Sequence, residues 1–427
     1  MQGDFENGLH CTSPGSYNKS LIADEFLIMS TIANNPSMSW PPTDKSASGP
    51  LANVRVLDMT AVGMGPYCTQ TLGDYGADVI KLESPAGDVF RHATPSKHAG
   101  MGAPFMQLNR NKRSLSLDLK NPDGIALAKQ LVLAADILVY NVRPDAMRKL
   151  GLSYAALKAD HPRLIHCGVY GFSEAGPYAG RPAFDDIIQA MSGLADLQGR
   201  GRDEPPTYVS SIIADKITGL SAVGAILAAL YERERSGLGQ SVEVPMFETM
   251  VGFNLMEHMG GATFGEASHD MGYGRTLSPI RKPFRTADGH IGLLPYTSDQ
   301  WQRFFELADQ PEIMTDPKFA TPDARAKNIT ELYEMLAQII PSRTSADWLA
   351  LFAQNDIPAA PIHRLEDLQA DPHLKATAFF EQHAHPTEGD IVMPKPAANF
   401  GRTPARIRSA APNLGQDNRS IKDFFKG

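Results

Sequence analysis

One acidic residue stands out because of its surroundings. Asp215 lies in the stretch SSIIADKITG (Ser210–Gly219), close to the predicted start of a long apolar helix. A carboxylate among apolar residues is costly unless it is paired or has a chemical task. The helix dipole would help to keep it ionised, and an ionised carboxylate in a dry pocket can attack an activated acyl group. The alternative is an ordinary helix-start acid that pairs with a nearby lysine.

A second acidic site begins another predicted helix after a Gly/Pro-containing turn. The stretch RPAFDDIIQA (Arg181–Ala190) contains Asp185 and Asp186 directly after Phe184. Both could be simple first-turn acids, which the helix dipole favours. The residues alone leave a functional and a structural role equally open.

A basic segment contrasts with the acidic balance of the chain. Residues 101–150 contain eight Lys or Arg against four Asp, whereas the whole chain carries a formal net charge of −8. Such an excess suits a small polyanion such as a pyrophosphate, although a solvated face with scattered ion pairs would look the same. The tetrapeptide Asn141–Pro144 favours the first interpretation. It follows a predicted strand directly, and ligands of open α/β sheets bind at the carboxyl ends of strands.

The turn at Val62–Cys68 partly matches a dinucleotide-binding fingerprint. Gly63 and Gly65 stand between a predicted strand and a helix, and Glu83 follows at the distance of a ribose-binding acid. The position of the third glycine is occupied by Cys68, so the match is weak. The alternative is a tight turn whose glycines allow a backbone or a ligand to come close.

Strands that alternate with helices must position these residues. We predict strands over 54–59, 78–83, 114–119, 136–141, 164–170, 241–245 and 289–296, with a further short strand inside 356–364. We predict helices over 66–75, 122–135, 210–235, 246–258, 301–307, 329–340 and 345–354. The alternation through the first half indicates a mostly parallel sheet covered by helices.

Length and composition limit the class of protein. A chain of 427 residues predicts two to three domains at roughly 150 residues each. With 42% hydrophobic residues the composition is globular, and the net charge argues against nonspecific nucleic-acid binding. Three cysteines form neither a disulfide scaffold nor a CxxC pair. Without a signal peptide or an apolar run of about 18 residues, we expect a cytoplasmic protein that makes no membrane contact.

The predicted domain organisation has four parts. Residues 1–48, rich in Ser, Asn and Pro, form a flexible extension with one possible helix around 21–31. Residues 49–240 together with 390–427 form a large domain, 241–264 a linker, and 265–385 a smaller domain. The fold class is therefore α/β, with a Rossmann-like parallel-sheet domain and a smaller α+β domain.

Taken together, these segments resemble the class III CoA-transferase family, which includes the formyl-CoA and carnitine CoA-transferases and the α-methylacyl-CoA racemases. The resemblance covers about residues 50–420 in order. It depends on PLANVRVLDMT, on Gly65–Arg91 with CTQTLGDYGADVIKLESPAGD, on NRNKRSLSLDLK, on ADILVYNVRPDAMRKLGL, on the Phe184–Asp185 helix and on the Asp215 helix.

The resemblance implies roles for individual residues. Asp215 matches the catalytic aspartate, which forms a mixed anhydride and then an aspartyl-CoA thioester. The positions that contact CoA correspond to Val62, Leu117, Lys120, Asn141, Val142, Arg143 and Lys149, with Arg91 and Lys112 as weaker candidates. The family further implies an interlocked homodimer. It implies no metal and no permanently bound cofactor, since coenzyme A enters as a substrate.

Positions where this chain departs from the family pattern limit the reactions that it could catalyse. The racemase branch has a His where this chain has Phe184, and a phenyl ring cannot carry a proton across the α-carbon. Gly63 and Ser84 replace residues that are polar or charged in formyl-CoA transferase. We therefore expect a CoA-transferase acting on other acids. An acyl-CoA racemase or epimerase is the first alternative, and a non-catalytic CoA-binding protein is the second.

A basic cluster near residue 280 could serve the acceptor acid. Arg275, Arg281, Lys282 and Arg285 lie in GYGRTLSPIRKPFRTADG. We hypothesise that one of them, Arg275 in particular, holds the second carboxylate of a dicarboxylate substrate. The alternative is a solvated loop, because charge runs usually lie on solvated surface. With Gly63, Phe184 and Asp185, Arg275 completes the predicted substrate pocket.

Overall fold

The computed structural model describes residues 39–43, 48–200, 202, 204–265 and 271–426. Most of the extension 1–48, including the possible helix around 21–31, lies outside the described residues. Its end is anchored, since the Trp40 indole N–H donates to Asp78 Oδ2 (2.7 Å) and the carbonyls of Pro41 and Pro42 accept from Arg113 (3.1 and 3.2 Å).

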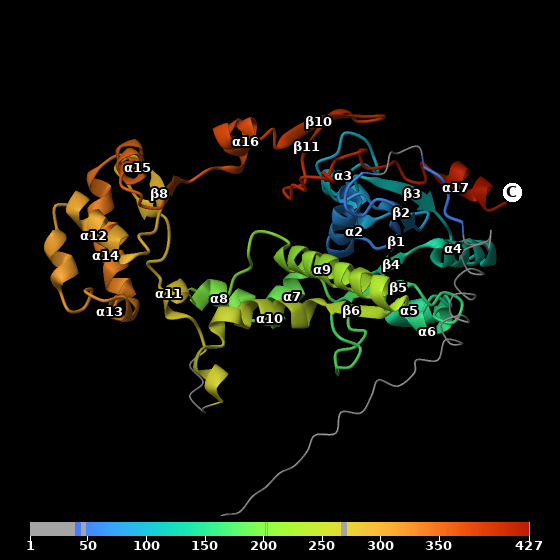
Figure 1. Cartoon of the computed structure of the whole chain (residues 1–427), viewed down its shortest axis with the longest axis horizontal. Coiled ribbons are helices and arrows are strands. Elements are labelled where there is room, and N and C mark those ends of the chain that lie inside the picture. The colour runs from blue at the N-terminus through green and yellow to red at the C-terminus, as the bar shows by residue number, and fades with distance from the viewer. Residues whose placement is uncertain (1–38, 44–47, 201, 203, 266–270, 427) are drawn as a thin grey trace, which may run out of the picture.

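A six-stranded, fully parallel sheet forms the centre of the protein (Figure 1). Its strands are β1 (Arg55–Met59), β2 (Asp78–Glu83), β3 (Lys112–Ser116), β4 (Ile137–Tyr140), β5 (Ile165–Tyr170) and β6 (Ser241–Pro245). Their order is β3-β2-β1-β4-β5-β6, so the winding direction switches between β1 and β4. This order is that of dinucleotide-binding sheets, whose ligands bind at that switch point. The predicted α/β class with a parallel sheet is confirmed.

Helices cover both faces of this sheet, and alternation along the strands explains why. Val56 belongs to one buried cluster with α2 (Met64–Asp74) and α9 (Ile213–Ser236), whereas its neighbour Leu57 belongs to a second cluster. The second cluster draws on α4 (Pro122–Ala134), α5 (Pro144–Lys149), α6 (Tyr154–Leu157) and α17 (Asn418–Phe424). Because both faces are covered, the strands consist of nearly continuous apolar runs.

The long helix α9 is the predicted buried helix. It ends at Gly237, which adopts the left-handed conformation (φ 80°) that glycine tolerates best. By length and composition α9 could cross a membrane, but half of the relevant window is buried inside the protein, as in the core helix of a folded domain.

Residues 241–264 do more than link two parts. β6 pairs with β5 and thereby extends the central sheet, and it is followed by α10 (Met246–His258) and the 3-10 turn η3 (Gly260–Phe264). A strand that is hydrogen-bonded to the central sheet belongs to that sheet, so the predicted linker over 241–264 is wrong for β6. Two short helices, α7 (Asp185–Met191) and α8 (Leu194–Arg200), precede α9.

A third hydrophobic cluster forms beyond residue 273. It contains the antiparallel sheet β7-β8-β9 (Phe284–Arg285, His290–Leu293, Ala359–Pro361) and the helices around it. The helices of this region are α11 (Gly274–Leu277), α12 (Ser298–Leu307), α13 (Pro322–Lys327), α14 (Ile329–Ile339) and α15 (Ser345–Gln354). The predicted strand over 289–296 is shorter in the structure, and the short strand predicted inside 356–364 is β9. The structure also contains the predicted helices over 329–340 and 345–354, as α14 and α15, within one residue of their predicted bounds.

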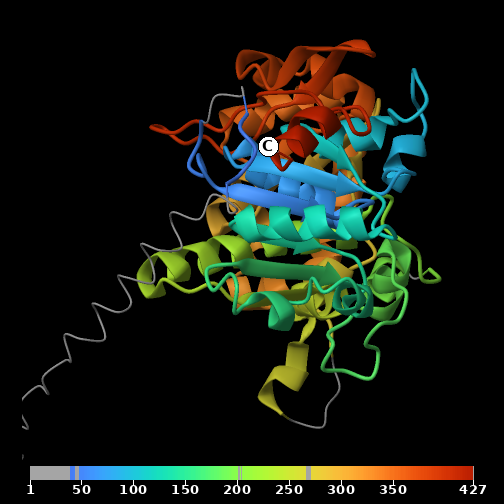
Figure 2. The same ribbon diagram turned by 90° about the vertical axis from the view of Figure 1, so that its right-hand side faces the viewer.

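The chain then returns to the central sheet. After α16 (Pro372–Ala376), β10 (Phe380–His385) and β11 (Gly389–Pro394) form an antiparallel hairpin beside α3 (Ala103–Leu108). A domain boundary at residue 385 would divide this hairpin, whose strands share backbone hydrogen bonds. The C-terminal segment lies along β3, where Asp417 Oδ2 accepts from the backbone N–H of Ser114 (2.8 Å; Figures 1 and 2).

Candidate active site

The turn between β1 and α2 lies at the switch point of the sheet and is held from several sides. Asn141, the first residue after β4, donates to the carbonyl of Ala61 (2.8 Å) and accepts from its N–H (3.0 Å). Val62, which follows Ala61 in this turn, has a positive φ of 70°, which is rare for a residue with a β-branched side chain. A strained backbone of this kind persists only where its surroundings fix it, and it is concentrated at functional sites.

Asp215 reaches this turn from the third position of α9. Its side chain is buried (8% exposed) directly against Gly63, since a Cβ added to Gly63 would overlap with Asp215 Oδ2. A side chain at position 63 would therefore displace the carboxylate or the turn. The sequence suggested that the glycines of this turn admit a backbone or a ligand, but the group that approaches Gly63 in the structure is a side chain. The approach is to a carboxylate rather than to a dinucleotide.

Asp185 holds the start of α9 from the first turn of α7. Its Oδ1 accepts from the backbone N–H of Asp215 (3.0 Å), one of the donors that the first turn of a helix leaves free. Its Oδ2 accepts from Gln189 Nε2 (2.6 Å), and Gln189 Oε1 in turn accepts from the N–H of Val209 (2.9 Å). Gln189 therefore orients Asp185, a role that its spacing of four residues on one helix could have suggested.

Among the residues that the structure describes, no cation pairs with Asp215. Burial, and after it the neighbouring negative charge of Asp185, together raise the pKa of Asp215 to about 7. The pairing with a lysine that the sequence left open is not formed, because the amine of Lys216 donates to Ser211 Oγ (2.8 Å). A carboxylate of this kind is a stronger nucleophile and base than an exposed one, and it switches its charge near neutral pH.

The predicted CoA-contact residues lie along the carboxyl edge of the sheet. Val62 follows β1, Leu117 follows β3, and Asn141–Arg143 follow β4. The cationic members are exposed: Lys120 beyond β3, Arg143 at the start of α5 and Lys149 at its end. Exposed cations at one edge leave room for a polyanion.

The two weaker candidates are engaged elsewhere. Arg91 is buried in a bidentate ion pair with Glu83 (both contacts 2.7 Å), and Lys112 is buried beside Asp58 (3.0 Å). Glu83, which could have bound a ribose, is therefore the partner of an arginine. Both cations lie inside the fold and not on the edge where the exposed ones gather.

Of the other two residues predicted to line the substrate pocket, Phe184 lies near Asp215 and Arg275 does not. Phe184 immediately precedes α7 and is 65% exposed, so it stands beside the site with its ring in solvent. Arg275 in α11 donates to the hydroxyl of Tyr333 (3.4 Å) and lies over the ring of Tyr296 (5.3 Å to its centroid), both in the region of the third cluster. Within one chain, α11 lies apart from the start of α9 (Figure 1), so the structure does not bring Arg275 to Asp215.

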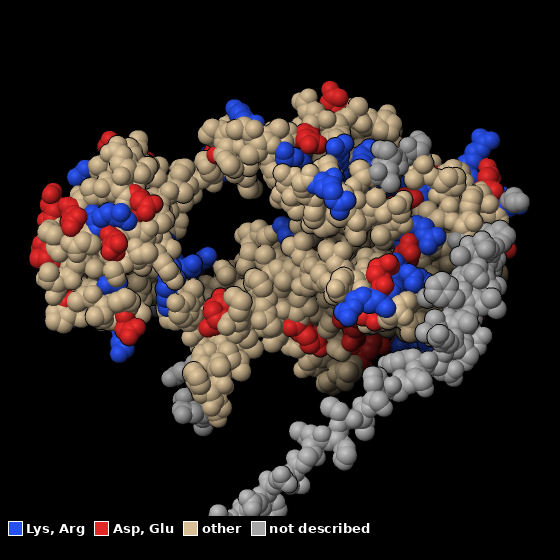
Figure 3. All heavy atoms as spheres, viewed as in Figure 1, with Lys and Arg blue, Asp and Glu red and all other residues tan. Residues whose placement is uncertain are grey.

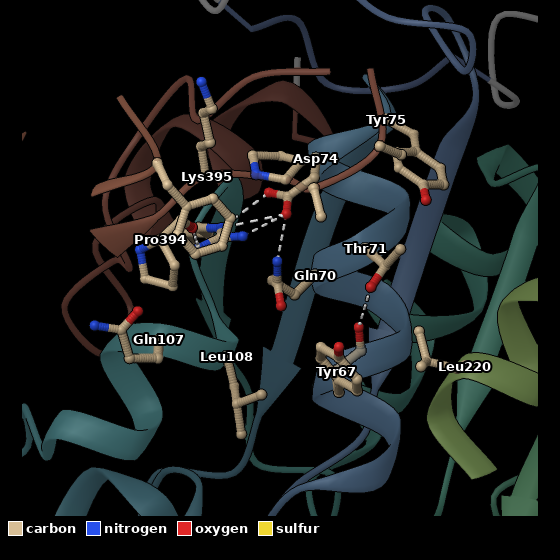
Figure 4. A pocket seen from close by; sticks show the side chains of 15 residues that line it. Tyr67, Gln70, Thr71, Asp74, Tyr75, Gln107, Leu108, Leu220, Pro394 and Lys395 are labelled. Carbon is tan, nitrogen blue, oxygen red and sulfur yellow. Dashed lines mark hydrogen bonds and ion pairs between the residues drawn. The ribbon is translucent and has the colours of Figure 1, made fainter. Parts of the chain in front are cut away.

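A cavity of about 500 Å³ lies on the other side of α2 (Figure 4). Its polar side chains satisfy one another: Arg110 pairs with Asp74 (2.7 Å) and donates to the carbonyl of Pro394 (2.6 Å), and Gln70 also donates to Asp74. Its lining includes no predicted site residue among the described parts of the chain. We assign it no role in the chemistry.

The fold and the site define an α/β enzyme with a buried carboxylate at the switch point of a Rossmann-like sheet. The family model of CoA-transferase family III matches residues 51–418, and the chain therefore belongs to that family. This confirms the resemblance that the sequence motifs indicated.

Relatives of known name support the same assignment. The chain is 32% identical to the mouse protein named succinyl-CoA:glutarate CoA-transferase, over 89% of this chain and 87% of the relative. It is 34% identical to the succinyl-CoA–D-citramalate CoA-transferase of Chloroflexus aurantiacus, over 87% and 93%. Among solved structures, it is similar to a CAIB/BAIF family protein from Brucella suis, with a TM-score of 0.74, 32% identity, and coverage of 88% of this chain and all of that one.

Proposed function

We propose that this protein transfers CoA from an acyl-CoA to a free carboxylic acid, with Asp215 as the nucleophile. The carrying observation is the buried Asp215 carboxylate, packed on Gly63 and unpaired by any cation among the described residues, in a member of CoA-transferase family III. The two named relatives both use succinyl-CoA and a dicarboxylic acid. We therefore propose succinyl-CoA as donor and a short dicarboxylate as acceptor.

The chemistry requires no proton transfer in its main steps. A carboxylate oxygen of Asp215 attacks the thioester carbonyl, the C–S bond breaks, and a mixed anhydride and CoA thiolate result. The thiolate attacks the aspartyl carbonyl, releases the donor acid as a carboxylate and leaves an aspartyl-CoA thioester. The acceptor carboxylate then attacks the carbonyl of that thioester, the C–S bond breaks, and a second anhydride and CoA thiolate result. The thiolate attacks its acyl carbonyl, which releases the new acyl-CoA and regenerates the Asp215 carboxylate.

Burial of Asp215 protects these intermediates. Anhydrides and thioesters hydrolyse if water reaches them, so the site must exclude water between steps. An 8% exposed carboxylate under Gly63 meets that need. Asp185 accepts from the N–H of Asp215 with one oxygen and from Gln189 with the other, so we propose a positioning role for it and not proton transfer at the α-carbon. This favours a transferase over a racemase.

We propose that the carboxyl edge of the sheet binds CoA. Val62, Leu117, Asn141 and Val142 would contact its apolar and amide parts, and Lys120, Arg143 and Lys149 its phosphates. The exposure of the three cations supports this assignment. Charge-assisted hydrogen bonds to phosphate are the strong kind.

We propose that two chains form an interlocked homodimer. Large apolar side chains are exposed on the neighbouring helices α7 and α10 and on η3, namely Ile187 (47%), Met191 (38%), Phe253 (54%), Met256 (84%) and Phe264 (81%). Exposed apolar groups of this density mark interaction surfaces. Figure 3 shows an opening between the two parts of the chain, which would admit a second chain. Light scattering should give twice the chain mass of 46.4 kDa, whereas a monomer would contradict the proposal.

We propose that Arg275 holds the distal carboxylate of the acceptor. It lines a cavity of about 250 Å³ together with Arg325 and the tyrosines 273, 296 and 333, and no acidic residue is among the described lining residues. Since Arg275 lies apart from Asp215 in one chain, it would have to act on the site of the second chain. Arg275→Ala should reduce transfer to dicarboxylates more than to monocarboxylates, and an unchanged preference would exclude this role.

One experiment tests the reaction itself. Purified protein is mixed with succinyl-, acetyl- or butyryl-CoA and a panel of mono- and dicarboxylic acids, and mass spectrometry follows new thioesters. Asp215→Ala should abolish them. Asp347→Ala is the matched control, because Asp347 occupies the same third position in α15 and should leave transfer unchanged. Deuterium uptake at the α-carbon without an acceptor would indicate a racemase, and CoA binding without turnover a binding protein.

A further inference from the structure

The turn that packs on Asp215 depends on three side chains, of which the sequence analysis named only Asn141. Four residues connect β1 to α2, and their backbone groups are bonded by side chains from three other places. The carbonyl of Thr60 accepts from Lys81 Nζ (2.7 Å). The N–H of Val62 donates to Asp88 Oδ1 (3.0 Å), and Ala61 is bonded on both sides by Asn141.

Lys81 and Asp88 form one buried unit. Their side chains are fully buried, and Lys81 Nζ lies 2.9 Å from Asp88 Oδ2. Asp88 Oδ1 also accepts from the N–H of Phe90 (3.0 Å), so the carboxylate is fixed by its own loop as well as by the lysine. Around them lie further buried charges of the fold: Asp58, Glu83, Arg91 and Lys112.

This unit bonds the strained residue of the turn. A left-handed conformation of Val62 costs free energy, and the N–H of this residue is the group that Asp88 holds. Without that bond, Val62 is free to return to a negative φ. The next residue, Gly63, would then move off the Asp215 carboxylate on which it packs.

We infer that Lys81 and Asp88 are positioning residues for Asp215: through Val62 they hold Gly63 as the cover that keeps water from the carboxylate. This inference rests on the proposed function of Asp215 for its kinetic consequence. Its structural consequence, that Gly63 stays packed on the Asp215 carboxylate, does not depend on which reaction the protein catalyses. Neither side chain touches Asp215, so neither is a catalytic residue.

The test compares Asp88→Asn with a matched variant at the opposite edge of the sheet. Asp136 likewise accepts from a backbone N–H (Arg55, 2.9 Å) and pairs with a cation (Arg55 Nε, 2.8 Å), but it lies at the amino ends of the strands. We expect Asp88→Asn to lower kcat by about 10- to 100-fold, as small displacements at reacting groups do. We expect Asp136→Asn to leave kcat unchanged for the folded protein.

A second readout does not require turnover. Coupling of carboxyl groups to an amine by a water-soluble carbodiimide, followed by peptide mass spectrometry, reports how accessible Asp215 is. Asp88→Asn should label Asp215 severalfold faster than wild type, and Asp136→Asn should not. Equal labelling rates and equal kcat in the two variants would overturn the inference.

A second variant, Asp88→Glu, guards against a failure of Asp88→Asn to fold. Asp88→Glu retains the charge beside Lys81 and is expected to fold, but its longer side chain displaces Val62, so it should also lose kcat and gain labelling. If Asp88→Asn does not fold, Asp88→Glu decides the question. If wild type transfers no CoA, the proposed function fails, while the labelling rates still decide whether Lys81 and Asp88 hold the cover.

Discussion

Two aspartates at opposite edges of the central sheet lie in opposite electrostatic surroundings. At the amino edge, Asp136 pairs with Arg55 (2.8 Å) and lies 3.4 Å from Arg233. Burial alone would raise the pKa of Asp136, but the hydrogen bonds and charge of Arg55 hold it below its usual value. At the carboxyl edge, Asp215 has burial and the like charge of Asp185 acting together, and its pKa rises to about 7.

The comparison shows that the partners, and not the residue type, decide what a buried aspartate does. A carboxylate paired with arginine stabilises the fold and is chemically inert. One placed beside another carboxylate destabilises the fold in its ionised form and is available for reaction. The molecule concentrates this cost at the edge where ligands of parallel sheets bind.

The largest expected effect comes from removing the reactive carboxylate. Asp215→Asn should lower the rate of CoA transfer by at least about 10³-fold, because loss of a covalent nucleophile removes the reaction path. At pH 8 it should also raise the free energy of unfolding, by on the order of 1–3 kcal/mol, because a buried charge beside Asp185 disappears. Acyl-CoA analysis and urea unfolding measure the two effects. Retained transfer would contradict the role of Asp215.

The opposite result is expected at the other edge. Asp136→Asn should lower the free energy of unfolding by about 2–4 kcal/mol, since it leaves Arg233, only 5% exposed, without its carboxylate. The transfer rate of the folded protein should not change. Urea unfolding followed by circular dichroism gives the stability. If Asp136→Asn lost much of its activity but none of its stability, the contrast between a structural Asp136 and a reactive Asp215 would be wrong.

A methyl group at Gly63 should sharpen the comparison. Gly63→Ala places a Cβ where Asp215 Oδ2 lies, so the turn or the carboxylate must move, and transfer should fall by about 10- to 100-fold. Gly224→Ala in α9 is the control. Among the described residues, no atom beyond its chain neighbours and the backbone of its own helix lies within 4 Å of its added Cβ, and alanine should stabilise this helix by up to about 1 kcal/mol.

Binding of CoA should depend on the exposed cations of the carboxyl edge. Arg143→Ala should raise KM for the acyl-CoA by about tenfold, the equivalent of one charge-assisted hydrogen bond to phosphate, with little change in kcat. The effect should shrink at high ionic strength. Arg364→Ala is the control and should leave KM unchanged, because Arg364 is an exposed arginine at the N-cap of the 3-10 turn η6 (Leu365–Ala370), far along the chain from the predicted CoA contacts.

The smallest effect concerns pH. Transfer should decline below about pH 7 as Asp215 is protonated, and Asp185→Asn should move this decline to lower pH by removing the like charge. Since the folded pKa lies above the unfolded value, the folded state binds more protons between about pH 4 and 7. The contribution of Asp215 to stability therefore falls as pH rises through that window. Rate–pH profiles of both proteins test this, and coincident profiles would contradict it.

Local patterns predicted most of the elements and part of the site. The run DVIKLE gives β2 with its predicted bounds, and MFETMVGFNLMEH gives α10, because apolar periodicity and nearby turn residues define such segments. Asp215 and Gly63 were found from local context. Lys81 and Asp88 were not, because a lysine in an apolar strand and an acid in a loop have no partner visible in the sequence.

What the sequence determined by itself is therefore the parallel α/β fold, the family and the identity of the unusual aspartate. Those depend on residues that are close together along the chain or on the order of whole motifs. Only the tertiary structure decided which charges meet. It placed Asp185 rather than Lys216 beside Asp215, and Glu83 rather than a ligand beside Arg91. Electrostatic effects depend on distance in space and on burial, and folding alone sets both.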